Sequence, residues 1–345
     1  MALSGGQHAR LSPLPRRVAD RLEKHLRVSS PPPGYDPRDR PDSELASFAL
    51  PPRPDRSTAP EAYRNWLRAM SPPLVFPPRP EVLADMFAVL PTSVRGARFA
   101  NVRSIAESSR NWSGGYVRPK DRSPVALVQG NWHVPSTSAP GAGAEYAMSS
   151  WVGLDGNDPA SISMPQVGVQ AAHVENPSEE WLLAWWQWWV KPAPDALQIA
   201  ILTLPITIGD EIYAQVQAVG PAEASFFIKN MAQGVAFSGI YSSPITNQTG
   251  PTPLRLDVEG RTAEWIVERP VVPGHDLWLP DFGTLLFTNC NAAVASGAGG
   301  ILTDLQLDCS RLIALHEWDD PRVRGRLASK PGRETSTAFR LTYVA

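Results

Sequence analysis

The stretch TAEWIVERP, from Thr262 to Pro270, has the two-residue alternation of a β-strand, and stretches of this kind decide the fold. Successive side chains of a strand point to opposite faces, so Glu264, Ile266 and Glu268 share one face and the apolar residues between them share the other. Glu264 is explained either by solvent exposure at a sheet edge or by a polar site on one face of a sheet.

Short alternating stretches of the same kind follow one another from about Asn101 to the end of the chain. They are separated by Gly, Pro, Asn and Ser turns, and few helix candidates interrupt them. This pattern is typical of an all-β sandwich or barrel. The expected strands are ALVQGNWHVP, SSWVGLDG, SMPQVGVQ, WLLAWWQWWV, EIYAQVQAV, FFIKNM, AEWIVER, TLLFTNC and STAFRLTYVA.

Three of these strands carry polar or aromatic side chains and glycines on one face and apolar residues on the other. If they are neighbours of the strand that holds Glu264, their polar faces form one groove, in which the glycines leave room for a ligand. The alternative is a solvated outer face of a sheet. The residues on these faces are Trp151, Gly153 and Asp155 in the first strand, Gln166, Gly168 and Gln170 in the second, and Trp185, Gln187 and Trp189 in the third.

Residues 1–100 differ from the rest of the chain and form a Pro-rich basic segment. They hold 17 of the 36 prolines and 15 Lys and Arg against 10 Asp and Glu, whereas residues 101–345 hold 17 against 24. Proline runs favour extended connectors. Between them we expect short amphipathic helices over Leu14–Leu26, in APEAYRNWLRAM and in RPEVLADMFAVL. Opposite net charges suggest a cover or pro-segment that docks on an acidic β-domain.

Composition excludes several classes of protein. The formal net charge is −2 without a clustered Lys/Arg stripe, so we expect no nucleic-acid partner. No run reaches the roughly 20 apolar residues that span a bilayer, and the N-terminal residues lack the apolar region of a signal peptide. The only cysteines are Cys290 and Cys309, which form either one disulfide or two buried thiols.

Common catalytic motifs are also missing, since the chain has no HExxH, GxSxG or GxxxxGK sequence. Six other short motifs instead come in the order and approximate spacing of the glutamic peptidases, also called eqolisins. They are NWSGGYV at Asn111, GNWHVPS at Gly130, SSWVGLDG at Ser149, PQVGVQ at Pro165, LAWWQWWV at Leu183 and AEWIVER at Ala263. The resemblance covers about residues 111–344 and leaves residues 1–100 outside.

The resemblance implies a concanavalin-like antiparallel β-sandwich of two sheets and an endopeptidase that needs no metal or cofactor. Its catalytic glutamine falls on Gln166 and its catalytic glutamate on Glu264. Its groove tryptophan and aspartate fall on Trp151 and Asp155. A carboxylate can take a proton from the attacking water and return it to the leaving nitrogen, while a neutral amide stabilises the oxyanion.

Two residues depart from the family pattern, which commonly has Asp in place of Gln170 and Glu in place of Gln187. We assign both to the substrate-binding groove. The loss of two carboxylates removes like-charge repulsion, so we expect Glu264 to ionise more readily and the acidic optimum typical of the family to shift. We also expect Gln166 and Glu264 on adjoining strands of one sheet.

The expected partner is a polypeptide substrate of a monomeric enzyme that has no membrane or nucleic-acid partner. The family is typically secreted, and the sequence itself assigns no compartment. An alternative function is a non-catalytic β-sandwich that binds peptide or carbohydrate. In that case, Trp185, Trp186, Trp188 and Trp189 would offer stacking faces to the ligand.

Overall fold

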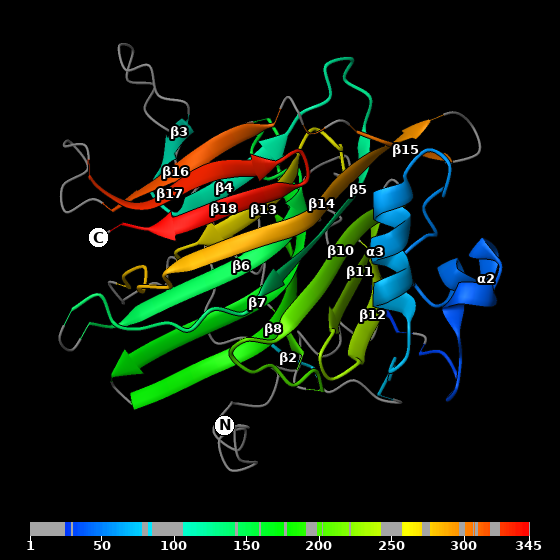
Figure 1. Ribbon diagram of the computed structural model, residues 1–345, viewed down its shortest axis with the longest axis horizontal. Coiled ribbons are helices and arrows are strands. Elements are labelled where there is room, and N and C mark those ends of the chain that lie inside the picture. Colours follow the sequence, from blue (N-terminus) through cyan, green and yellow to red (C-terminus); the bar gives the residue numbers. More distant parts are fainter. Residues whose placement is uncertain are drawn as a thin grey trace, which may run out of the picture.

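A computed structural model gives the structure of the chain (Figure 1). The residues that it describes are 25–28, 30–77, 82–84, 106–141, 144–158, 160–175, 178–190, 199–201, 203–220, 222–242, 257–270, 277–296, 301–305, 307, 310–317 and 325–344.

Two large, mainly antiparallel sheets form the body, so the predicted β-sandwich is confirmed. The first sheet has the strand order β2, β9, β8, β7, β6, β13, β4 and β16, with β3 beyond β16 as a parallel neighbour. These strands are β2 (Val82–Ala84), β9 (Ile199–Ile201), β8 (Ser178–Val190), β7 (Ser163–Glu175), β6 (Tyr146–Leu154), β13 (Ala263–Glu268), β4 (Trp112–Val117), β16 (Arg311–Glu317) and β3 (Ala106–Ser109).

The second sheet has the order β15, β14, β5, β10, β11, β12 and β1. Its strands are β15 (Ile301–Asp304), β14 (Thr284–Ser296), β5 (Val125–His133), β10 (Glu211–Gly220), β11 (Glu223–Asn230), β12 (Val235–Ser242) and β1 (Leu26–Arg27). A hairpin of β17 (Arg326–Thr335) and β18 (Ala338–Tyr343) connects β16 to β14.

Strand β14 belongs to both sheets. Its residues 284–287 pair with β18 and its residues 288–294 pair with β5. The register shifts between Thr288 and Asn291, where Asn289 has a φ of 49°. Asn tolerates this left-handed conformation better than most residues, and a bulge of this kind bends a strand. The bulge therefore lies where β14 passes from one sheet to the other.

The main core lies between the two sheets and consists of every second residue of their strands. The first sheet contributes large aromatic residues such as Trp186, Trp188 and Trp265, and the second sheet contributes Trp132 and Phe226. Fully burying an apolar side chain stabilises the fold by roughly 1.5–3 kcal/mol. The period of two thus fixes which residues of the first sheet point inward, and the others must lie on its outer face.

Residues 30–77, the front segment, pack on the outer face of the second sheet. In Figure 1 helix α3 (Pro60–Met70) lies beside β10, β11 and β12, with α2 (Asp42–Ser47) further out. The helix begins at a proline, which suits the first helical position because its missing N–H has no partner there anyway. A second apolar cluster joins the two parts, with Leu45, Leu50, Trp66, Ala69 and Met70 against Tyr213, Phe227 and Ala236.

Polar contacts fix the same interface. Asn65 Nδ2 donates to Asn131 Oδ1 at 2.8 Å, and Arg68 pairs with Glu211 at 2.7 Å. The buried Lys229 donates from Nζ to the carbonyl oxygens of Ala69 at 2.8 Å and Ser71 at 3.0 Å. A cation at the C-terminal end of a helix satisfies carbonyls that lack a partner within the helix. Burial lowers the pKa of Lys229 to about 8.

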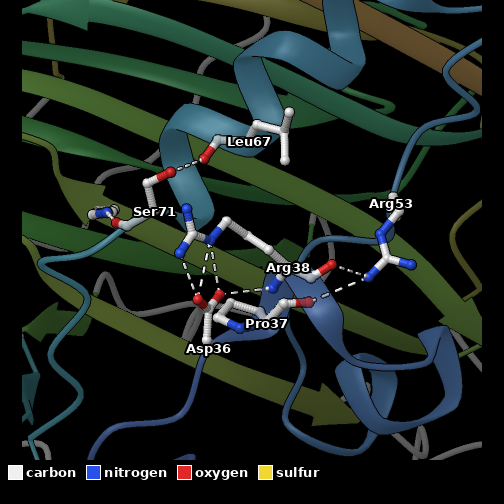
Figure 2. Close-up of polar contacts among 7 residues, drawn as sticks. Asp36, Pro37, Arg38, Arg53, Leu67 and Ser71 are labelled. Carbon is white, nitrogen blue, oxygen red and sulfur yellow. Dashed lines mark hydrogen bonds and ion pairs between the residues drawn. The ribbon is translucent and has the colours of Figure 1, made fainter.

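Arg53 holds the front segment together internally, as Figure 2 shows. Its Nη2 donates to the carbonyl oxygens of Pro37 at 3.3 Å and Arg38 at 2.9 Å. These two residues belong to a short 3-10 helix, η2 (Pro37–Asp39), which Asp36 caps by accepting the N–H of Arg38 at 3.0 Å. Arg53, which follows α2, therefore ties its part of the chain to the short helix η2 that precedes α2.

The structure corrects two expectations for the front of the chain. The helix expected in RPEVLADMFAVL is wrong at residues 82–84, which form β2 and pair with β9. Leu26, expected on a helix, lies in β1 and pairs with Tyr241. Edge pairing satisfies backbone groups that a helix periodicity alone cannot anticipate. Of the expected helix from Leu14, residues 14–24 lie outside the described residues, as does Cys309, while Cys290 is a buried free thiol.

Substitution of Trp66 tests the docking of the front segment. Trp66 has no exposed surface, so Trp66→Ala should lower the free energy of unfolding by about 3–5 kcal/mol, as truncation of a buried aromatic residue does. Arg64 lies on the exposed side of the same helix, and Arg64→Ala should change the free energy of unfolding by no more than about 0.5 kcal/mol. Chemical denaturation measures both values. Equal, small effects would show that the segment is a loose tether.

Candidate active site

One row of residues crosses the outer face of the first sheet, and it contains Glu264 and Gln166. Glu264 on β13 lies opposite Gly153 on β6, and Gly153 lies opposite Gln166 on β7. Gln187 on β8 extends the row on one side, and Tyr116 on β4 extends it on the other. Directly opposite residues of antiparallel strands point to the same face. The four side chains therefore project from one face, with a glycine at the centre.

Gln166 and Glu264 do not lie on adjoining strands, so that expectation is wrong. Strand β6 runs between theirs, which separates the two backbones by about 9.6 Å, or two strand spacings. Gly153 occupies the position between them, and any side chain there would fill the space over it. A Cβ at Gly153 would lie 3.0 Å from Cζ3 of Trp151 and 3.1 Å from Cβ of Gln166.

Gln187 orients Gln166. The Nε2 of Gln166 donates to Oε1 of Gln187 at 2.6 Å, and both side chains are buried. The Oε1 of Gln166 has no hydrogen-bond partner among the described residues. An amide nitrogen carries two hydrogens, so one remains for a further acceptor. Gln187, which replaces the glutamate common in the family pattern, thus gives Gln166 a neutral hydrogen-bond acceptor in place of a charged one.

Glu264 is completely buried, and its two oxygens differ. Oε1 accepts the backbone N–H of Asn157 at 3.0 Å, whereas Oε2 has no hydrogen-bond partner among the described residues. Burial raises the pKa of Glu264 to about 8. Burial, which the family pattern did not reveal, therefore opposes the readier ionisation that we expect from the loss of two neighbouring carboxylates.

Asp155 binds the part of the chain that precedes β13, and its carboxylate does not belong to the row of Glu264 and Gln166. It has a φ of 71° directly after β6, and its carboxylate accepts the backbone N–H groups of Glu259 at 2.8 Å, Gly260 at 3.1 Å and Arg261 at 2.6 Å. These residues lead into β13. Burial raises the pKa of Asp155 to about 6. All three bonds support the turn that brings Asn157 to Glu264.

The other expected site residues occupy neighbouring rows of the same face. Trp151 lies opposite Ile266 and Gly168, and Gln170 lies opposite Ser149, which in turn lies opposite Glu268. Gln170 Oε1 has no hydrogen-bond partner among the described residues. Apolar side chains of the same strands also lie on this outer face and form a third cluster, which consists of Trp112, Tyr116, Trp151, Met164, Trp185, Ile266 and Ile313.

The sequence interpretation missed Glu268 as a site residue. It is buried and accepts the indole N–H of Trp151 at 2.9 Å and the amide of Asn111 at 3.3 Å. Burial raises the pKa of Glu268 to about 7. The alternation of β13 already put Glu268 on the face of Glu264, so this signal was present in the sequence.

The four tryptophans of β8 that the alternative function would use as stacking faces lie on opposite faces of the first sheet. Trp186 and Trp188 belong to the core between the sheets, so neither offers a face to a ligand. Trp185 and Trp189 belong to the cluster on the outer face. The alternative of a tryptophan-lined binding surface therefore loses two of its four residues.

Among the described residues, no group of three or more His, Cys, Asp and Glu side chains is arranged to hold a metal ion. None of the helices described is both long enough and apolar enough to cross a membrane.

The chain is similar to several known proteins. The model of the Peptidase A4 family matches residues 110–314. Aspergillopepsin-2 of Aspergillus niger is 27% identical in a comparison over 217 residues, and the match covers 56% of this chain and 68% of that protein. A scytalido-glutamic peptidase bound to a transition state analog inhibitor is 20% identical, with a TM-score of 0.49 over 68% of this chain and 99% of the other. The aspergilloglutamic peptidase of Aspergillus niger is 23% identical, with a TM-score of 0.44 over 58% and 99%.

The raised pKa of Glu264 predicts how stability depends on pH. The folded state binds this proton more tightly than the unfolded state does, where the pKa is near 4.5. The resulting stabilisation is fully present below about pH 4.5 and is lost as the pH rises through about 8, at up to about 1.4 kcal/mol per pH unit. Glu264→Gln should remove this contribution to the slope of the unfolding free energy against pH, which urea unfolding at several pH values measures. The exposed Glu334→Gln should keep the parent slope, and an unchanged slope in Glu264→Gln would contradict the assignment.

Proposed function

Since the chain belongs to the Peptidase A4 family, the glutamic peptidases or eqolisins, we propose that it is an endopeptidase in which Glu264 activates water and Gln166 stabilises the oxyanion. The substrate is then a polypeptide. The observation that carries the proposal is the row on the outer face of the first sheet, where Gly153, which has no side chain, separates the two side chains.

The arrangement supports a peptide carbonyl placed over Gly153. The Glu264 carboxylate accepts a proton from water while the water oxygen bonds to the carbonyl carbon. The carbonyl oxygen becomes an oxyanion, to which Gln166 donates the amide hydrogen that Gln187 does not hold. The protonated Glu264 then donates to the leaving nitrogen as the carbon–nitrogen bond breaks, which restores its carboxylate.

The two oxygens of Glu264 have different roles in this mechanism. The N–H of Asn157 fixes Oε1, so Oε2 is the oxygen that exchanges protons with water and leaving group. Glu264 must be ionised before it can accept a proton. Its raised pKa in the closed site moves this ionisation toward neutral pH, well above the usual range of a glutamate.

Asp155 supports the same chemistry without touching the substrate. Its three backbone hydrogen bonds hold residues 259–261, and the turn that follows it supplies the N–H of Asn157. We therefore assign Asp155 a positioning role, and we assign substrate contact to Trp151 and Gln170.

Substitutions of the two central residues test the proposal. Glu264→Gln keeps the shape of the side chain and removes its proton-accepting function, so hydrolysis should fall by about 10,000-fold or more, at or beyond the upper end for general acid–base catalysis. Gln166→Ala removes one oxyanion donor and should cost about 100 to 1,000-fold. Cleavage of a denatured protein substrate, followed from about pH 3 to 8, measures both losses.

The control for these variants is Glu334→Gln, which changes an exposed glutamate on β17 that pairs with Arg340. It should cleave at the parent rate. If Glu264→Gln also cleaves at the parent rate, Glu264 is not the catalytic base and the row on β13, β6 and β7 is not the active site.

A further inference from the structure

Glu268 is a second buried carboxyl group on the outer face of the first sheet, two rows away from Gln166. Its side chain has only 2% of its surface exposed, and it accepts hydrogen bonds from Trp151 at 2.9 Å and Asn111 at 3.3 Å. No Lys or Arg pairs with it among the described residues. Burying a carboxyl group is costly unless its hydrogen bonds are fully used. An apolar residue would fill the same position with a smaller desolvation penalty. The role of Glu268 must therefore lie in the groups that it binds by hydrogen bonds.

What Glu268 holds is the indole ring of Trp151. The Nε1 of this ring is bonded to Glu268, while Cζ3 on its other side approaches Gly153, where a Cβ would lie 3.0 Å away. The ring thus extends along β6 from Glu268 to the glycine between Glu264 and Gln166. Trp112 packs edge-on against it, with 5.2 Å between ring centroids. The indole N–H is a donor only, so Glu268 supplies the acceptor that fixes the ring in this orientation.

We propose that Glu268 is a positioning residue of the active site, which fixes Trp151 as the floor on which the scissile peptide lies between Glu264 and Gln166. The inference rests on the proposed function for the identity of the reacting peptide. It adds a residue that acts through Trp151 and does not touch the substrate. A ring free to rotate about its side-chain bonds would shift the peptide relative to both catalytic groups, and misplacement by about 1 Å costs on the order of 100-fold in rate.

Four variants test the contact. Glu268→Leu removes the acceptor and should lower kcat about 100-fold with little change in KM, because the catalytic geometry is lost rather than general affinity. Glu268→Gln keeps an acceptor oxygen and should retain activity within about fivefold. Trp151→Phe removes the indole N–H and part of the floor, and it should lower kcat about as much as Glu268→Leu. The double variant Trp151→Phe/Glu268→Leu should be no slower than the slower single variant, within about threefold, since both changes break one contact.

The matched control is Glu317, a buried glutamate of the same sheet that accepts the N–H of Leu279 at 2.8 Å and pairs with Arg326 at 3.1 Å. Glu317→Gln should lower the thermal midpoint and leave kcat and KM at parent values. If Glu268→Leu lowers only the thermal midpoint in the same way, or if the losses in the double variant are additive, Glu268 is merely structural and the inference is overturned.

An NMR measurement separates this inference from the proposed function. The indole signal of Trp151 is identified by its loss in Trp151→Phe, and in the parent protein it should shift between about pH 5 and 8 as Glu268 ionises nearby. In Glu268→Gln most of that shift should be lost, with only the smaller contributions of the more distant Glu264 and Asp155 remaining. A parent protein that cleaves nothing but shows the shift would refute the proposed function while keeping the contact. A Trp151 signal insensitive to both pH and Glu268→Gln would overturn the inference even in an active enzyme, and this readout stands if Glu268→Leu does not fold.

Discussion

The register of β13, β6 and β7 is the constraint on which the rest of the site depends. Strand side chains alternate with a period of two, so a slip of one residue would turn Glu264 and Gln166 into the core and bring Trp265 and Val167 to the outer face. The large aromatic residues packed between the sheets prevent such a slip. The same strand register therefore fixes both the apolar core and the polar row. The peptidase chemistry proposed for the row depends on the packing of the core beneath it.

The second physical theme is the burial of acids on a face that points away from the core. Glu264, Glu268 and Asp155 all have a pKa above the usual range because burial disfavours their charged forms. Each is compensated differently. Asp155 uses backbone N–H groups and Glu268 uses an indole and an amide, whereas Glu264 keeps one oxygen without a partner among the described residues. A buried oxygen without a partner is expensive, and such a cost is commonly found at functional sites.

The sequence predicted the β-sandwich and the faces of its strands, because alternation is a local property that each strand carries by itself. It did not predict that β6 lies between the strands of Gln166 and Glu264, because strand order depends on long-range pairing. The same limit explains Trp186 and Trp188, which look like ligand-stacking residues until the second sheet covers them. Asp155 was assigned to the polar face by alternation, but β6 ends at Leu154 and the left-handed turn redirects its carboxylate. Glu268 was on the correct face and was overlooked because Glu264 was the residue of this strand that was carried over from the family pattern.

The most direct test of the central claim fills the space between the two proposed catalytic residues without changing either of them. Gly153→Ala adds a methyl group that must push aside Trp151, Gln166 or the carbonyl oxygen of Pro165 by a few tenths of an ångström. Gly332→Ala on β17 adds the same group where the nearest atom is 4.0 Å away. If the scissile carbonyl lies over Gly153, kcat/KM of Gly153→Ala should fall by about 100-fold or more at a temperature where the variant is folded, although the methyl group lowers its thermal midpoint, and Gly332→Ala should be unaffected. A folded Gly153→Ala that cleaves as fast as Gly332→Ala would contradict the account.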